Sequence, residues 1–211
     1  CTFFGNGLNR SIPFCKSPFS PKCNCVSLNI ANNYNMKTLP EQMTTEMDGL
    51  RKVHIYNGNL TALPQNMEKL VEIRDFQISF NKLKEFNVDV REWKLLVRLF
   101  LHDNNIRSYN EEALWAHPNL VSLDVADNFG LKMPDQTIEI SMPSLQYFSA
   151  SNNSARMDMS FDNVKFPSLT FLFVNGNNIV NFERFLDESL KVSVSEVGIA
   201  RCNLRSLPPS L

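Results

Sequence analysis

The chain lacks the features that mark several common classes of protein. No run of apolar residues approaches the roughly 18 needed for a membrane-spanning helix, and one of the longest runs is "LTFLFV". The formal net charge is -1 at pH 7, so there is no excess of basic residues to attract nucleic acid or an anionic membrane. The sequence therefore predicts neither nucleic-acid binding nor direct membrane insertion by this segment.

Motifs for catalysis are also missing. The three histidines belong to no H-E-x-x-H motif, and there is no G-x-S-x-G elbow and no phosphate loop. Asp103, Asp124 and Asp127 could gather near His102 and imitate a metal or acid–base site, although a solvated polar patch accounts for them better. The stretch "DNNIRSYNEE" lacks the central glycine of a calcium loop. We expect no enzymatic activity, no metal and no cofactor.

Cysteine is scarce and unevenly placed. Four of the five cysteines lie within residues 1–25, namely Cys1, Cys15, Cys23 and Cys25. This cluster favours two disulfides closing an N-terminal cap, which needs an oxidising compartment; the alternative is a zinc site, but the paired C-x2-C spacing is absent. Four cysteines allow three pairings, and the spacing does not choose among them. With Cys1 at its start and no signal peptide, we interpret the chain as a processed or excised piece of a larger protein.

What the sequence does contain is one phrase repeated at a regular interval. The stretch "LVSLDVADNFGL" from Leu120 recurs, with substitutions, in about eight copies across residues 26–211. The copies start near residues 26, 50, 73, 96, 120, 145, 169 and 194. Self-similarity at this period is typical of a solenoid.

The phrase L-x-x-L-x-L-x-x-N-x-L predicts a strand followed by a turn. The central L-x-L points its apolar side chains into the core, while the flanking residues point to an exposed face. The asparagine then turns the chain and its amide satisfies buried backbone groups. Stacked copies form an asparagine ladder of Asn33, Asn81, Asn104, Asn128, Asn153 and Asn177. Gly58 and Cys202 occupy the two remaining places, and we expect Cys202 to be a buried rung because a buried thiol acts as a small apolar group with a weak donor.

The repeats resemble the leucine-rich repeat family, in its extracellular type with repeats of 23 to 25 residues. The resemblance is supported by "LP" after three phrases, as at Leu39-Pro40, and by "P-x-L" before three others. It implies an α/β solenoid that forms a curved, right-handed horseshoe segment. A parallel β-sheet would line the concave face, with irregular or short helical segments on the convex side. The cysteine-containing start is similar to N-terminal caps of that family. Together with the Trp93 and Trp115 segments, it resembles oomycete cell-surface leucine-rich repeat proteins.

The residues that flank each apolar pair would form columns along the concave face. Tyr147, Phe171 and Phe173 would then expose aromatic rings on adjacent rungs, as interface hot spots do; the alternative is that loops or a longer cap cover these rings as extra core. Polar groups around them would supply orientation and selectivity. The candidate ligand-binding residues are Tyr147, Phe171, Phe173, Phe100, Arg98, His102, Asp103, Asp124, Tyr56 and His54.

Three N-x-S/T sequons, at Asn9, Asn59 and Asn152, agree with the secretory pathway, and a glycan on Asn152 would restrict access near Tyr147. We predict a non-catalytic recognition module, part of the ectodomain of a cell-surface receptor or adhesion protein, whose partner is a protein or peptide. The alternatives are a secreted inhibitor of a foreign hydrolase and a structural component of an extracellular surface. The sequence stops in mid-repeat after "LRSLPPSL", so we expect further repeats or a partner at an open C-terminal end.

Overall fold

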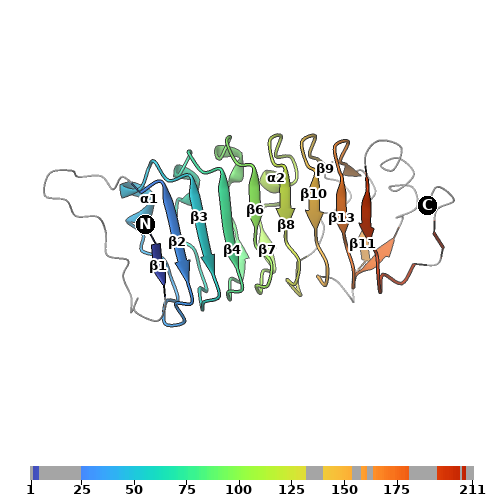
Figure 1. Ribbon diagram of the computed structural model, residues 1–211, viewed down its shortest axis with the longest axis horizontal. Helices are drawn as coiled ribbons and strands as arrows, with labels where there is room; N and C mark the ends of the chain where they lie inside the picture. Colours follow the sequence, from blue (N-terminus) through green and yellow to red (C-terminus); the bar gives the residue numbers. More distant parts are fainter. Residues whose placement is uncertain are drawn as a thin grey trace, which may run out of the picture.

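One parallel sheet of nine strands organises the computed structural model, which describes residues 2–4, 25–131, 140–153, 158–160, 164–180, 194–204 and 206–207. The strands stack side by side along the long axis of the molecule (Figure 1). Their order follows the chain, with β1 (Thr2–Phe4), β2 (Ser27–Ala31), β3 (Lys52–Tyr56), β4 (Asp75–Ser79), β6 (Arg98–Phe100), β8 (Ser122–Asp124), β10 (Tyr147–Ser149), β13 (Phe171–Phe173) and β15 (Glu196–Gly198). The predicted solenoid is confirmed.

Each strand after β1 lies in one copy of the repeated phrase, and its apolar pair faces inward. Val53 and Ile55 on β3, for example, are buried, whereas Lys52 is exposed. This alternation places successive side chains on opposite faces of the sheet. β1 is the exception, since Thr2–Phe4 carries no repeat phrase and pairs in parallel with residues 29–31 of β2.

Short elements cover the other face of the sheet, as the resemblance to leucine-rich repeats implies. They are α1 (Met43–Glu46), η1 (Met67–Lys69), η2 (Val90–Glu92) and α2 (Glu111–Leu114). Three two-stranded pairs run beside them: β5 (Glu85–Phe86) with β7 (Ser108–Tyr109), β9 (Ile140–Ser141) with β12 (Val164–Lys165), and β11 (Asp158–Ser160) with β14 (Asn178–Val180). No helix in the described ranges is long and apolar enough to cross a membrane.

Two tryptophans thicken the core between the sheet and these short elements. Trp93 and Trp115 are fully buried. The Trp93 ring packs 4.8 Å from Phe76 of β4, centroid to centroid, and its Nε1–H donates to the Met67 carbonyl at 3.1 Å. The Trp115 ring meets Phe148 of β10 edge-on at 5.8 Å, and its Nε1–H donates to the Tyr109 hydroxyl at 2.9 Å. Each large ring therefore ties a covering segment to the sheet.

The asparagines of the repeat form a buried ladder that connects each repeat to the one before it. Asn104 Nδ2 donates to the Ile78 carbonyl of the preceding repeat at 2.7 Å, and its Oδ1 accepts from Leu83 N–H at 3.0 Å. Asn81, Asn128, Asn153 and Asn177 donate to the preceding repeat in the same way. The structure places Cys202 in this row, where its buried Sγ–H points to the Val174 carbonyl at 3.1 Å. Burial also raises the pKa of this thiol.

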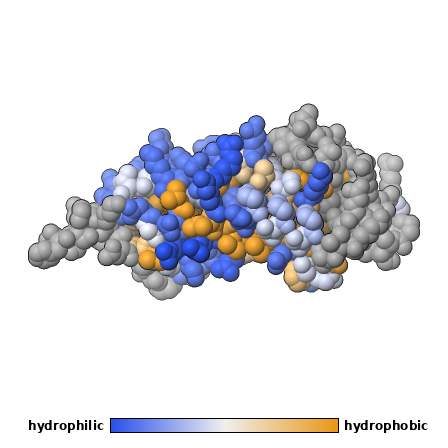
Figure 2. Space-filling model, turned by 90° about the horizontal axis from the view of Figure 1, so that it is seen from above, coloured by the Kyte–Doolittle hydropathy of each residue, from blue (hydrophilic) through white to orange (hydrophobic). Residues whose placement is uncertain are grey.

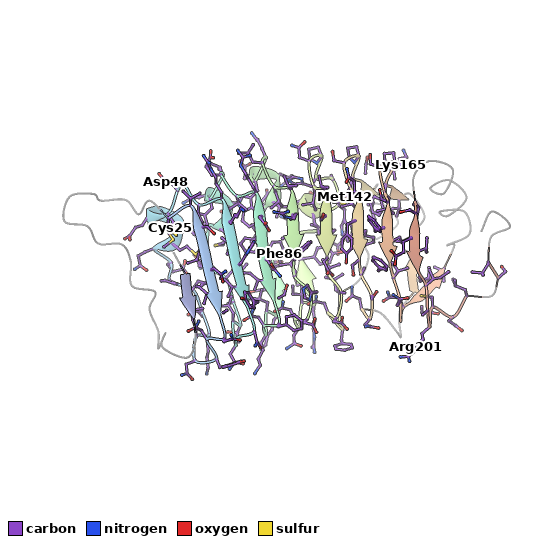
Figure 3. The ribbon with its side chains drawn as sticks, in the orientation of Figure 1. Cys25, Asp48, Phe86, Met142, Lys165 and Arg201 are labelled. Carbon is purple, nitrogen blue, oxygen red and sulfur yellow. The ribbon has the colours of Figure 1, made fainter. Side chains whose placement is uncertain are left out.

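A second row of residues, each directly before a ladder position, adopts left-handed backbone. We call it the turn column, and it consists of Asn32, Asn57, Phe80, Asp103, Asp127, Asn152, Gly176 and Arg201, all with positive φ. Asparagine, aspartate and glycine tolerate this conformation best. At Gly176 a Cβ would collide with Asn152 Oδ1, so glycine fits this place without displacing the Asn152 side chain. Arg201, labelled in Figure 3, lies at the end of the molecule opposite Cys25.

His117 is a buried titratable group in the core that the repeat phrase does not explain. Its Nε2 lies 3.2 Å from the Trp93 carbonyl, which can only accept, so Nε2 carries the proton. Burial lowers the pKa of His117 below its usual 6.5, against the raising effect of backbone hydrogen bonds. Below about pH 6.5 the unfolded chain therefore binds a proton that the folded chain does not.

We expect the unfolding free energy to fall as the pH drops from 7.5 to 5.5, by at most about 1.4 kcal/mol per pH unit from this residue. Urea unfolding of the wild type and of His117→Gln at each pH measures the effect, because Gln keeps a donor near the Nε2 position and does not titrate. His54 and His102 are common to both proteins and cancel in the difference. Parallel pH profiles for the two proteins would contradict the assignment to His117.

Candidate ligand-binding surface

The outward side chains of the strands form columns on what we call the sheet face, which is the face predicted to be concave. The strands pair in register from β2 to β15. One column reads Ser27, Lys52, Asp75, Arg98, Ser122, Tyr147, Phe171 and Glu196, and the other reads Asn29, His54, Gln77, Phe100, Asp124, Ser149, Phe173 and Gly198. Both columns consist of residues that flank the apolar pairs, as the repeated phrase predicts.

An ion cluster occupies the first half of the sheet face. Arg98 donates to Asp75 Oδ2 from Nη2 at 2.6 Å and from Nε at 3.0 Å. His54 Nε2 lies 3.2 Å from Asp75 Oδ1. Burial acts to raise the pKa of Asp75, but His54 and Arg98 outweigh it, and the pKa is lowered. Asp75 was not predicted as a site residue, yet it joins two that were, and its charge is satisfied within the cluster.

Aromatic side chains occupy the second half of the sheet face. The Tyr147 ring lies 6.5 Å from Phe100 and 5.8 Å from Phe173, centroid to centroid. Ser122, in register between Arg98 and Tyr147, is small enough to let Phe100 and Tyr147 approach across β8. We call Phe100, Tyr147 and Phe173 the aromatic row. Phe171 lies beside it and is 39% exposed.

Glycine at position 198 makes room for one end of the aromatic row. A Cβ on Gly198 would lie 2.8 Å from Cδ1 of the Phe173 ring and 2.8 Å from Asn175 Nδ2. Real Cβ atoms do not approach side chains this closely. The position of the Phe173 ring therefore depends on the absence of a side chain at Gly198 of the neighbouring strand β15.

Asp124 lies on β8, the strand between Phe100 on β6 and Tyr147 on β10. Its Oδ1 accepts from the Ala126 N–H at 3.1 Å. Burial raises the pKa of Asp124, although the Ala126 N–H, His102 and the Ser149 hydroxyl act in the opposite direction. Within the part of the chain that the structure describes, the Asp124 carboxylate makes no ion pair. It is thus a partly buried acid that forms an ion pair with no described basic side chain, although His102 acts on its pKa.

His102 and Asp103 lie at the edge of the sheet face together with Phe80, which was not predicted as a site residue. His102 Nδ1 lies 2.9 Å from Asp103 Oδ2. Phe80 meets the His102 ring edge-on at 5.0 Å and is 52% exposed. Its φ of 54° is unusual for a residue with a bulky side chain. The signal in the sequence is that Phe80 stands where most repeats carry Asn, Asp or Gly.

Comparison with known proteins identifies the architecture. No family model matches the chain, and no curated protein matches it. A leucine-rich repeat protein of Leptospira interrogans has a similar structure, with a TM-score of 0.54 and 16% identity over 88% of this chain. The fold is a leucine-rich-repeat solenoid. This chain spans 60% of that protein's length. A plant ice-binding protein also matches, with a TM-score of 0.37 and 16% identity, over 86% of this chain and 76% of its own.

Other predicted residues of this leucine-rich-repeat solenoid lie apart from the aromatic row. Tyr56 and His54 lie on β3, with β4 between them and β6. Asn59 Nδ2 donates to the Tyr34 carbonyl, and the exposed Asn152 donates from Nδ2 to Asp127 Oδ1 at 2.9 Å. Asn9 lies outside the described residues, and glycosylation of the three sequons stays a prediction.

The structure gives no support to a disulfide at Cys25. Its thiol is free and buried, and Sγ lies 3.3 Å from the Ser27 carbonyl. Cys1, Cys15 and Cys23 lie outside the described residues, so pairing among them stays a prediction. No group of three or more His, Cys, Asp or Glu side chains in the described ranges could hold a metal ion.

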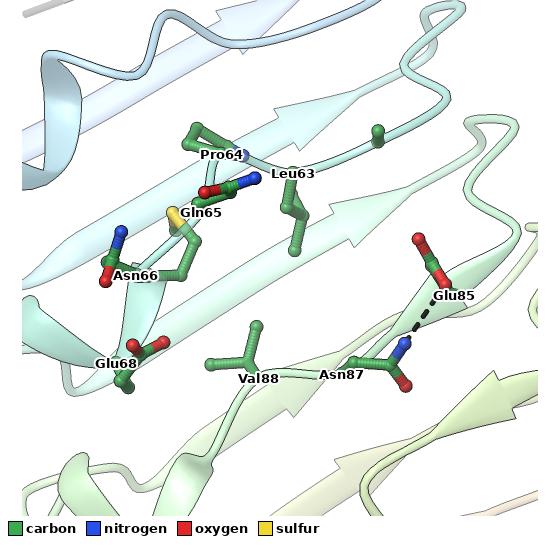
Figure 4. A pocket seen from close by; sticks show the side chains of 10 residues that line it. Leu63, Pro64, Gln65, Asn66, Glu68, Glu85, Asn87 and Val88 are labelled. Atoms are coloured by element: carbon green, nitrogen blue, oxygen red, sulfur yellow. Dashed lines mark hydrogen bonds between the residues drawn. The ribbon is translucent and has the colours of Figure 1, made fainter.

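A small pocket on the covering side of the solenoid is a weaker candidate than the sheet face. Its volume is about 180 Å³, and Figure 4 shows Leu63 and Val88 facing one another within it, with Glu68 and Glu85 at its margin. Asn87 Nδ2 already donates to Glu85 Oε2 at 3.0 Å. Ligand pockets usually enclose about 300 Å³ or more. This pocket is too small for a drug-sized molecule.

Exposed apolar residues also gather at the edge where the strands begin. Figure 2 shows apolar side chains in the middle of this edge, surrounded by hydrophilic ones. Val71, Leu95 and Val97 are each 39% to 49% exposed. These aliphatic side chains lack the aromatic rings and the unpaired charge that distinguish the sheet face. The sheet face is therefore the best candidate surface.

Proposed function

We propose that this chain is a non-catalytic recognition module that binds a protein or peptide through its sheet face. The observation that supports the proposal most is the aromatic row with the adjacent Phe171, spread over β6, β10 and β13. Aromatic rings are enriched among the residues that dominate binding energy at interfaces. These rings lie on the outward face of the strands and therefore do not contribute to the core of the solenoid.

The arrangement of the surface favours rigid recognition. Each ring projects from a strand that is hydrogen-bonded on both sides, and the rings of the aromatic row pack against one another. Binding would therefore order few side chains, which leaves more of the contact energy for affinity. The ion cluster of His54, Asp75 and Arg98 would supply a polar margin that fixes orientation.

We further propose that the module works in the extracellular space, as part of the ectodomain of a cell-surface receptor or adhesion protein. The support is the N-terminal cluster of cysteines and the three sequons. The free thiol of Cys25 gives this setting no support. Peptide mapping under non-reducing conditions, with protein from the native source, tests the setting. Free thiols at all four N-terminal cysteines and unmodified asparagines would contradict it.

The binding surface is tested by Phe171→Ala combined with Phe173→Ala. Immobilised wild type and variant are exposed to detergent-solubilised cell-surface proteins and to secreted proteins from the native source, and captured proteins are compared by quantitative mass spectrometry. We expect the partner to bind the variant at least tenfold more weakly, because hot-spot rings are each worth about 2 kcal/mol or more. Titration calorimetry with the purified partner measures the ratio.

Phe129→Ala is the matched control, since Phe129 is an aromatic side chain that is 81% exposed and follows Asn128 outside the strands. It should leave binding unchanged. Loss of binding with the control, and not with the double variant, would move the interface to the edge of the solenoid. Self-association of the wild type without any captured partner, measured by sedimentation velocity, would favour the structural assembly role instead.

A further inference from the structure

We propose that the sheet face holds an arginine side chain of an extended peptide at a subsite formed by Asp124, Phe100 and Tyr147. This inference rests on the proposed function, because it names the chemistry that the same surface would select.

The two rings approach one another over the strand that carries the carboxylate. Phe100 is on β6 and pairs in register with Asp124 of β8, while Tyr147 is on β10, the next strand. Adjacent strands are about 4.8 Å apart, so β6 and β10 are separated by about 10 Å. The ring centroids are nevertheless only 6.5 Å apart. The two rings therefore converge above β8, the strand that carries Asp124.

Two basic side chains of the sheet face, Arg98 and His102, already contact other acids. Arg98 donates twice to Asp75 Oδ2, and His102 lies 2.9 Å from Asp103 Oδ2. An ionised carboxylate can accept about four hydrogen bonds. The Ala126 N–H and the Ser149 hydroxyl use part of that capacity at Asp124. The carboxylate can thus accept further donors from a cationic ligand.

A cation is the ligand group that this environment favours. A carboxylate partly withdrawn from water is costly without an opposite charge, and the raised pKa of Asp124 expresses that cost. Aromatic faces attract cations as well. Arginine meets both demands at once, because its planar guanidinium binds a carboxylate with paired donors while it stacks on a ring.

The spacing of the sheet face sets where a second contact of the peptide would fall. Phe171 and Phe173 are on β13, two strands beyond β8, which is a distance of about 10 Å. A peptide in the extended polyproline II conformation advances about 3.1 Å per residue with about three residues per turn, so side chains three positions apart lie about 9 Å apart on the same face of the peptide. A peptide lying across the strands would place its arginine at Asp124 and an apolar side chain against Phe171. The expected pattern is arginine and an apolar residue three positions apart.

Display of random twelve-residue peptides tests this subsite. The library is selected on immobilised wild type, on Asp124→Asn and on Glu85→Gln. We expect the wild type and Glu85→Gln to select the pattern of arginine and an apolar residue, and Asp124→Asn to lose the arginine enrichment. Glu85→Gln is matched because it removes the same charge from an exposed acid of β5, outside the sheet face. Asparagine keeps an acceptor for the Ala126 N–H, and Asp124→Asn should unfold at a temperature no lower than the wild type.

One selected peptide is then synthesised with arginine and with citrulline, which has a similar shape and no charge. Fluorescence anisotropy should show the arginine peptide binding the wild type at least tenfold more tightly, and the difference should vanish in Asp124→Asn. Equal affinities of the two peptides for the wild type would overturn the subsite even if the variant failed to fold. Peptides without arginine enrichment that still depend on Phe171 and Phe173 would overturn the subsite and leave the proposed function standing. Failure to recover any peptide whose binding depends on Phe171 and Phe173 would count against both.

Discussion

Replacing Asn104 by Ala is expected to lower the free energy of unfolding by about 3 kcal/mol or more. The side chain is 4% exposed, and its amide donates to the carbonyls of Ile78 and Leu101 and accepts from the Leu83 N–H. Alanine lacks the amide, so these three backbone groups would lose a hydrogen-bond partner while they stay buried. Each buried group without a partner costs about 1 to 3 kcal/mol, so the loss exceeds that of an ordinary hydrogen bond.

The neighbouring residue provides the control for this prediction. Asn105 is the same amino acid one position further along the chain, and it is exposed. Asn105→Ala should change the free energy of unfolding by no more than about 0.5 kcal/mol, as surface substitutions usually do. Urea titrations of the three proteins, followed by circular dichroism, measure the two differences. Similar small losses for both variants would mean that the backbone alone holds the turn.

Trp93→Ala is expected to destabilise the solenoid by about 3 to 5 kcal/mol. The ring is fully buried against Phe76 and Phe86, and the indole N–H satisfies the Met67 carbonyl. Alanine opens a cavity between the sheet and the covering segments, and stacked repeats relax only in part around it. Removing the ring also removes the hydrogen bond from Trp93, directly after η2, to Met67 of η1 in the preceding repeat.

Trp93→Phe separates the two contributions of this residue. Phenylalanine keeps most of the packing and deletes the donor to Met67, so the expected loss is about 1 to 2 kcal/mol. Thermal and urea unfolding of both variants measure the ranking, with the wild type as reference. A loss in Trp93→Phe as large as that in Trp93→Ala would assign the effect to the hydrogen bond and not to packing.

The repeated phrase determines the sheet because the physical demand is the same in every copy. An inward apolar pair and a buried turn must recur at one period, so the register of β2 through β15 can be predicted residue by residue. The same argument places Tyr147, Phe171 and Phe173 on one open face. It also places Asp124 on that face. The phrase does not predict that Asp124 forms no ion pair with the described residues.

The remainder depends on contacts between residues that have no fixed place in the phrase. Thr2–Phe4 pairs as β1 without any repeat motif, and Asp75 binds Arg98 and His54 only because three strands happen to carry those side chains in register. The burial of Trp93 in the core could not be predicted, because the repeated phrase describes only the strand and its turn. Phe80 could have been found, because an aromatic residue in the turn column departs from the Asn, Asp and Gly of most repeats.

The direction of the asparagine ladder has a consequence for biosynthesis. From Asn81 to Asn177, each asparagine of the ladder donates from Nδ2 to a carbonyl of the preceding repeat. A repeat emerging from the ribosome would leave one carbonyl at its strand without this hydrogen bond until 26 to 28 more residues have been translated. The next asparagine then arrives and completes the turn behind it. Assembly would accordingly proceed vectorially from the N-terminal end, one repeat docking on the last during translation.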